Sequence, residues 1–166
     1  MGDDLPYHER VSSNRTMGLF VALTILFLVL AYWRVTAAGV DVLAVVLFSF
    51  AGFFFFYSVN YRTLVIRLTS GSLELAFGVF RWTVRLDNVE QCQLDEIPLL
   101  KRMGGAGIHF MTVHGRYRAS FNFLEYPRVV IMLKRPRGPV RDVSFSTRRP
   151  GELVRLIREA AAARTA

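Results

Sequence analysis

The stretch Thr16–Trp33 reads TMGLFVALTILFLVLAYW and contains no charged side chain in 18 residues. A second uncharged stretch, Val42–Tyr61, reads VLAVVLFSFAGFFFFYSVNY over 20 residues. A helix that crosses about 30 Å of hydrocarbon needs roughly 20 residues at about 1.5 Å per residue. Neither stretch alternates between apolar and polar residues, so both are predicted to be transmembrane helices, at about 16–33 and 42–61.

The connection between the two helices, Arg34–Asp41, is too short to recross a bilayer. The helices are therefore predicted to form an antiparallel hairpin. Basic residues in short flanks favour the cytoplasm, and four arginines lie outside the hairpin against one, Arg34, in its connection. This count places both termini in the cytoplasm and the hairpin in the cytoplasmic (inner) membrane. The four outer arginines are Arg10, Arg15, Arg62 and Arg67.

A cleavable signal peptide is the alternative interpretation of the first apolar stretch, with Thr36-Ala37-Ala38 as its cleavage site. The acidic Asp3 and Asp4 are wrong for a signal peptide, and a second apolar stretch follows. The lone Cys92 cannot form an internal disulfide, which fits a cytoplasmic domain.

The composition of the whole chain hides two unlike segments. The 166 residues are 52% hydrophobic yet carry a formal net charge of +8. Residues 1–61 contain three arginines and four acidic residues, a net charge of −1, so residues 62–166 carry +9. These values exclude a disordered chain, a disulfide scaffold and a wholly soluble enzyme.

The hydrophobic period changes at Arg62 from continuous to alternating. Short alternating segments with turn signals between them predict seven or eight antiparallel strands in a meander over about 63–146, interrupted by a loop at Asp95–Gly107. The final segment, about 150–164, has apolar residues at helical spacing and is predicted to be an amphipathic helix. Its apolar stripe consists of Leu153, Leu156, Ile157 and Ala160.

This order of elements resembles that of bacterial and archaeal membrane proteins in which a pleckstrin-homology-like (PH-like) domain follows an amino-terminal transmembrane hairpin. The segments that carry the resemblance are Leu64–Gly71, Arg81–Val89, Gly105–Ile108 and Phe145–Leu153. The resemblance implies a cytoplasmic tail at 1–15, a transmembrane α-helical hairpin at 16–61, and a mainly-β PH-like barrel capped by a C-terminal α-helix at 62–166. It implies no particular enzymatic activity.

No arrangement of residues predicts catalysis, and neither a metal nor a cofactor is expected. His109 and His114 would point to opposite faces of one strand, so they would not converge on a metal. Cys92 fits a position in an alternating strand, and no basic group is identified that would activate its thiol as a nucleophile. The glycines of Gly104–Gly107 lack the spacing of a phosphate-binding loop.

The basic residues of the second segment are the remaining feature. Singly they fit a solvated surface, but together they would attract an anionic membrane, at about 1 kcal/mol each within a Debye length of about 8–10 Å. Nucleic acid is not expected as a partner, since no helix or aromatic platform matches the charge. The predicted contact residues are Lys101, Arg102, Arg116, Arg118, Lys134, Arg135, Arg137, Arg141, Arg148 and Arg149.

The expected function is therefore that of a non-enzymatic, membrane-anchored binding or scaffolding module, which contacts anionic lipid headgroups or a membrane-protein partner. The alternative is an accessory or assembly subunit of a larger membrane complex, or a homo-oligomer. Small residues in the two helices give weak support to this alternative, because Gly18 and the pair Ser49 and Gly52 would let helices pack closely.

Overall fold

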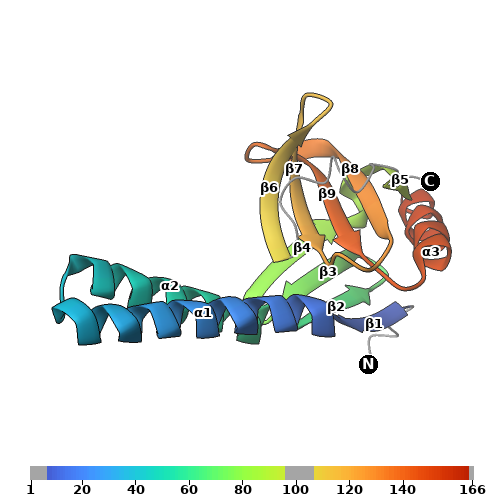
Figure 1. The fold of residues 1–166 in the computed structure, drawn as a ribbon. Helices are drawn as coiled ribbons and strands as arrows, with labels where there is room; N and C mark the ends of the chain where they lie inside the picture. Colours follow the sequence, from blue (N-terminus) through green and yellow to red (C-terminus); the bar gives the residue numbers. More distant parts are fainter. Residues whose placement is uncertain (1–6, 96–106, 165–166) are drawn as a thin grey trace. The chain divides into compact units, whose positions relative to one another are not determined.

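The computed structural model describes residues 7–95 and 107–164, which belong to two compact units (Figure 1). Residues Ser13–Arg62 form the first unit, called here the helical hairpin. The segments on either side of it, which include residues 7–12 and everything described from Thr63 onward, form the second unit, called the β domain.

The hairpin consists of α1 (Asn14–Ala38) and α2 (Val42–Asn60). Both helices are long and apolar enough to cross a membrane. The first helix runs five residues further than the sequence predicts, and it ends where Gly39 adopts a positive φ of 78°. The Arg34 guanidinium at this end donates to the Asp41 carboxylate, which also caps α2 through the Ala44 N–H.

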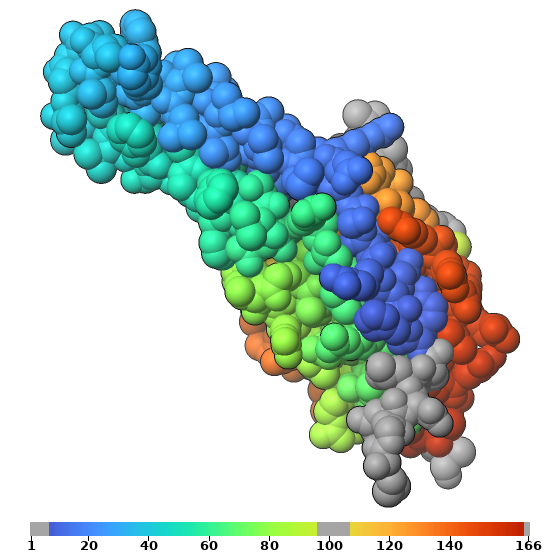
Figure 2. All heavy atoms as spheres, turned by 90° about the horizontal axis from the view of Figure 1, so that it is seen from below, coloured from blue at the N-terminus to red at the C-terminus, as the bar shows by residue number. Residues whose placement is uncertain are grey.

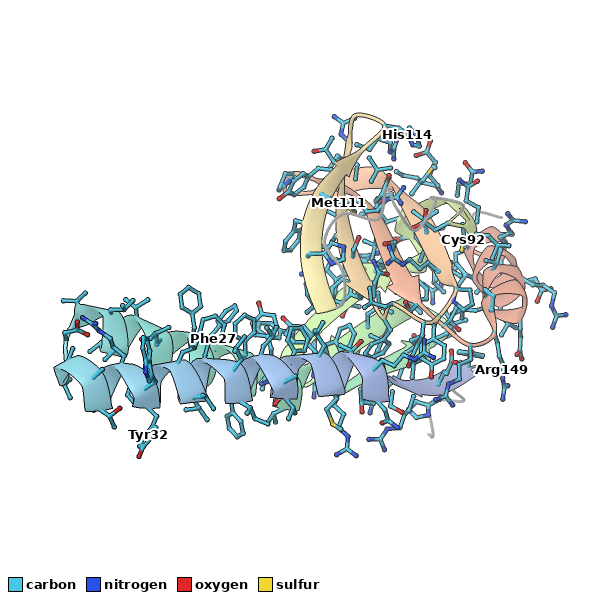
Figure 3. All side chains as sticks on the ribbon, viewed as in Figure 1. Phe27, Tyr32, Cys92, Met111, His114 and Arg149 are labelled. Carbon is cyan, nitrogen blue, oxygen red and sulfur yellow. The ribbon has the colours of Figure 1, made fainter. Side chains whose placement is uncertain are left out.

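Aromatic and small side chains hold the two helices together. The Phe27 ring stacks on both Phe50 and Phe54 of the facing helix, with centroids 5.3 and 5.4 Å apart (Figure 3). Ala31 and Ala44 are fully buried. Gly18, Ser49 and Gly52 do not contribute to this contact, because a Cβ on either glycine would meet nothing within 4 Å and Ser49 is exposed.

The first sheet of the β domain contains β1 (Tyr7–Ser12), β2 (Thr63–Leu68), β3 (Ser72–Phe77) and β4 (Phe80–Arg85), antiparallel and in that order. The meander of the last three strands was expected. The first strand takes up residues 7–12 of the tail predicted at 1–15, since Ser12 pairs with Thr63 and Tyr7 with Leu68. Residues that precede the hairpin in the sequence thus belong to the same sheet as residues that follow it.

The second sheet contains β5 (Val89–Leu94), β6 (Gly107–Val113), β7 (Arg116–Asn122), β8 (Arg128–Arg137) and β9 (Val140–Ser146). Its spatial order is β5-β8-β9-β7-β6, and β7 and β9 run parallel. The predicted all-antiparallel meander is therefore wrong for this half, because the β8–β9 hairpin inserts between β5 and β7.

The predicted barrel does not close: among the described strands no ladder joins the two sheets. A short 3-10 turn, η1 (Leu86–Asn88), carries the chain from β4 to β5. The predicted C-terminal helix is present as α3 (Pro150–Ala162), which packs against β5, η1 and β8 through Leu153, Val154 and Ile157.

The core lies between the inner faces of the two sheets. Phe77 of the first sheet stacks with Phe121 of the second at a centroid distance of 6.4 Å and meets Phe123 edge-on at 5.2 Å. Figure 2 shows β1 (blue) beside the segment that leads into α3 (red). Glu9 of that strand accepts hydrogen bonds from the Thr147 hydroxyl and the Arg148 N–H. The first strand therefore pairs with β2 and also bonds to the segment between β9 and α3, so it is an integral part of the domain.

Candidate anion-binding groove

A groove of about 640 Å³ lies between β4 and η1 on one side and the end of β8 on the other. The chain reaches this position because β8 is ten residues long, whereas its pairing with β5 ends at the Val89–Leu133 pair. The residues that line the groove are Trp82–Arg85, Asp87, Asn88 and Leu133–Arg137.

Asn88 holds the overhanging part of β8 in place. Its side-chain oxygen accepts from the Arg135 N–H at 2.8 Å, and its amide nitrogen donates to the Arg135 carbonyl at 3.0 Å. This pair of bonds replaces strand pairing where the ladder with β5 has ended. The backbone N–H and carbonyl of Arg135 thus both have hydrogen-bond partners, and the Lys134 and Arg135 side chains remain exposed.

Arg137 connects the two walls of the groove. Its guanidinium carbon lies 4.6 Å from the centroid of the Trp82 ring, and its Nη1 donates to the Thr83 carbonyl at 3.1 Å. Stacking of this kind fixes a guanidinium while leaving its other N–H groups available. The Trp82 indole Nε1 is buried, and it has no hydrogen-bond partner in the part of the chain that the structure describes.

The groove carries an excess of positive charge. Its one acidic group, Asp87, is bound by Arg85 at 2.6 Å, and the hydrogen bond from that guanidinium holds the pKa of Asp87 below its ordinary value. Within the described residues, no ion pair involves Lys134 or Arg135. Guanidinium and ammonium donors around an aromatic ring are suited to an anionic oxygen group such as a phosphate or carboxylate.

Arg116 and Arg118, which were predicted to contact a membrane surface, form ion pairs on the second sheet. The Arg118 side chain is only 6% exposed and lies between Asp95 (3.2 Å) and Asp142 (3.5 Å). Arg116 binds Asp142 at 2.7 Å and approaches Glu90 at 3.8 Å. Buried Arg118 cannot serve an exposed basic surface. It stabilises the second sheet instead.

These ion pairs belong to a polar face of the second sheet, opposite the core. Ser120 and Ser144 share a hydrogen bond of 3.0 Å on it, and Asn122 is fully buried. His109, across from Ser120, has a lowered pKa, chiefly because burial disfavours its charged form and secondarily because of the nearby Arg128 charge.

The other predicted contact residues are dispersed. Arg141 is exposed on β9, and Arg149 immediately precedes α3, where it approaches Glu152 at 3.5 Å (Figure 3). Arg148 covers the Tyr126 ring at 5.4 Å. Lys101 and Arg102 lie outside the described residues. Of the ten predicted residues, the structure brings Lys134, Arg135 and Arg137 together in the groove.

The titratable groups considered for chemistry are also separated. His114 lies at the β6–β7 turn, and Cys92 faces the core beneath α3, where burial raises the pKa of its thiol to about 12 (Figure 3). The described residues contain no group of three or more metal-ligating side chains.

Sequence analysis did not identify Trp82, Arg85 or Asn88 as part of a site. Trp82 and Arg85 fitted an alternating strand, and Asn88 followed it. Their association with β8 depends on contacts between residues about 50 positions apart, for which the sequence pattern carries no signal.

Comparison with protein-family models, with curated proteins and with solved structures finds no match to this chain.

Proposed function

We propose that this chain is a non-enzymatic, membrane-anchored PH-like module whose β domain contacts anionic lipid headgroups through the groove between β4 and β8. The observation that carries the proposal is the group of four basic residues that line this groove together with Trp82, namely Arg85, Lys134, Arg135 and Arg137. The meander at the start of the domain and the helix at its end support the PH-like assignment. The parallel β7–β9 pair is a departure from the expected meander.

The connections between the two units support a domain held close to the bilayer. Only Ser13 separates β1 from α1, and only Tyr61 and Arg62 separate α2 from β2. Because β1 pairs with β2, both ends of the hairpin leave from the same end of one sheet. A domain tethered at two adjacent points cannot drift far from the surface that its helices enter. The excess of arginine in the outer flanks favours the cytoplasmic face for this surface.

The position of the groove along β4 suits contact with headgroups. Its lining begins at Trp82, two residues from the start of β4, and extends to Arg85. At about 3.3 Å per residue, these positions lie roughly 7 to 17 Å along the strand from the end joined to the helices. The shorter of these two distances is comparable with the Debye length of about 8–10 Å, within which an anionic surface acts.

The groove contains its own reporter for a binding experiment. The chain has two tryptophans, so Trp33→Phe leaves Trp82 as the single one. The full-length Trp33→Phe protein in an uncharged detergent would be titrated with water-soluble dihexanoyl phosphatidylglycerol or dihexanoyl phosphatidylcholine. We expect saturable changes in Trp82 emission at lower concentrations of phosphatidylglycerol, weakened by salt. Equal responses to the two lipids would contradict the proposal.

A second candidate function, that of an accessory subunit in a membrane complex, is favoured by the outward face of α2. Val46, Ser49, Phe50 and Phe53 line an apolar hollow of about 320 Å³ there. Gly52 lies on an exposed face of the same helix. Purification from the native membrane in a mild detergent tests this function: a stoichiometric partner supports it, and a lone monomer contradicts it.

A further inference from the structure

The tight turn between β3 and β4 exposes two large apolar side chains. Phe77 pairs with Phe80, so the turn itself is Gly78-Val79, and Gly78 adopts a positive φ of 51°. Val79 is 71% exposed and Phe80 is 41% exposed. Phe77, by contrast, is fully buried in the core. The turn is therefore a protruding apolar tip on a domain whose neighbouring residue Arg81 is charged and exposed.

The strand register places this tip at a particular end of the first sheet. Ser12 pairs with Thr63, Leu64 pairs with Phe77, and Phe77 pairs with Phe80. The turn thus lies at the end of the sheet where β1 leads into α1 and where β2 follows α2. Neighbouring strands are about 4.8 Å apart, so the start of β4 is about 10 Å across the sheet from the start of β2.

The two ends of this sheet differ in chemistry. The β2–β3 turn at the opposite end has the polar sequence Thr69-Ser70-Gly71-Ser72, and its Thr69 hydroxyl accepts hydrogen bonds from the Gly71 and Ser72 N–H groups. The apolar turn occurs only at the end attached to the helices. This asymmetry is expected if one end faces water and the other faces a lipid interface.

We propose that the β3–β4 turn inserts Val79 and Phe80 into the interfacial region of the bilayer that the hairpin spans. This inference rests on the proposed membrane anchoring but not on the groove or on lipid charge. Two residues separate α2 from β2, so this end of the sheet lies at the level of the headgroups when α2 crosses the membrane. Exposed apolar side chains gain from transfer into that region, and the adjacent Arg81 can reach the phosphates. The turn then forms a third attachment of the chain to the bilayer.

Site-specific fluorescence in the full-length protein tests this proposal. An environment-sensitive fluorophore such as NBD is attached at Val79→Cys, and at Ser70→Cys in the opposite turn as the matched control. The native Cys92 is buried and has a raised pKa, so unsubstituted protein serves as the labelling blank. The proteins are placed in nanodiscs of phosphatidylcholine, with and without phosphatidylglycerol.

We expect the probe at 79 to emit at shorter wavelength than the probe at 70, to be quenched by lipids that carry a shallow doxyl group, and to be several-fold less sensitive to aqueous iodide. Both nanodisc compositions should give this result, even if the groove binds no lipid. Equal iodide quenching at 79 and 70 would overturn the proposal. Protection at 79 without doxyl quenching would also overturn it, because the turn would then be covered by protein, such as a second copy.

A third probe separates failure of this inference from failure of the membrane anchor. Leu26 is half exposed in the middle of α1. A probe at Leu26→Cys must be quenched by lipids with a deep doxyl group if the hairpin spans the bilayer. Quenching at 26 but not at 79 rejects the insertion of the turn alone, whereas no lipid quenching at either position rejects the anchor and the inference together.

Discussion

Glu9 and Thr147 are 138 residues apart in sequence, and a hydrogen bond from the Thr147 hydroxyl joins them at 2.5 Å. Glu9 also accepts from the Arg148 N–H and from the hydroxyl of Tyr7. The strand before the hairpin is therefore fastened both to β2 and to the segment that starts α3. The Tyr126 hydroxyl adds a bond to the Ser12 carbonyl.

Substitution Glu9→Ala should destabilise the β domain. Hydrogen bonds to a charged group contribute about 1.5–3 kcal/mol each, and part of the loss is recovered by water, so we expect a decrease of about 2–3 kcal/mol in the free energy of unfolding. Denaturant unfolding in detergent measures it. Glu159→Ala is the control, since that carboxylate is exposed and only approaches Arg155 at 3.8 Å. Equal effects of the two substitutions would contradict this role for Glu9.

Removal of residues 1–12 should prevent the domain from folding stably. The truncation exposes the edge of β2 and removes the buried Tyr7 and Val11 side chains. A fragment 62–166, which lacks the hairpin as well as β1, should therefore give weak near-ultraviolet circular dichroism and should aggregate. The matched control is the same fragment with residues 7–12 joined to it by a flexible linker, which should restore the signal. A well-folded, soluble fragment without β1 would show that the strand is dispensable.

Substitution Asp142→Ala should be among the most destabilising single changes in the protein. Asp142 is buried and contacts both Arg116 and Arg118, so its loss leaves the Arg118 charge buried with Asp95 as its remaining ion-pair partner among the described residues. Removing one partner of a buried ion pair costs about 3–5 kcal/mol. Thermal unfolding should show a much larger decrease than for Glu90→Ala, whose carboxylate is exposed. Similar melting temperatures for the two variants would argue against the buried cluster.

Cys92 should be unreactive in the folded protein. Burial raises the pKa of its thiol to about 12, so almost none is ionised at about pH 8.5, where a free thiol is half ionised. Iodoacetamide should therefore label the denatured protein rapidly and the folded protein very slowly, as followed by mass spectrometry. Comparable labelling rates would mean that the thiol is accessible.

His109 should make the domain less stable in mild acid. Burial lowers the pKa of His109 in the folded protein. In the unfolded chain the histidine pKa is about 6.5, so the unfolded chain binds the proton more tightly than the folded protein does. Stability contributed by neutral His109 is thus present above about pH 6.5 and is lost as the pH falls from there toward the folded pKa. The melting temperature of His109→Gln should decline less over this window than that of the unsubstituted protein. Parallel declines would contradict the assignment.

Much of the fold could be predicted from local patterns. The uncharged stretches correspond to two helices, alternation identified β2 to β5, and the stripe with Leu153 and Ile157 identified α3. The β1 strand was missed because six residues before a long apolar helix resemble a tail until β2 is present to pair with them. The parallel contact of β7 with β9 is non-local, and neither strand carries a signal for it.

The site was less predictable, because charge counts do not distinguish exposed from buried arginines. Arg116 and Arg118 alternate on one strand as surface residues would, yet the structure uses Arg118 as a buried partner of two aspartates. Lys134, Arg135 and Arg137 were predicted as contact residues, but their position in the groove with Trp82 depends on Asn88, which holds the end of β8 in place.

The central claim is that the groove binds anionic headgroups through its own side chains and not through general charge. The most direct test compares the dissociation constant for dihexanoyl phosphatidylglycerol, followed by Trp82 emission, between Lys134→Gln/Arg135→Gln and Arg10→Gln/Arg155→Gln. Both pairs remove two exposed charges. At about 1 kcal/mol for each basic residue, the groove variant should bind roughly 30-fold more weakly than unsubstituted protein, while the control pair should change affinity little. Equal weakening by the two pairs, or none by the groove pair, would contradict the account.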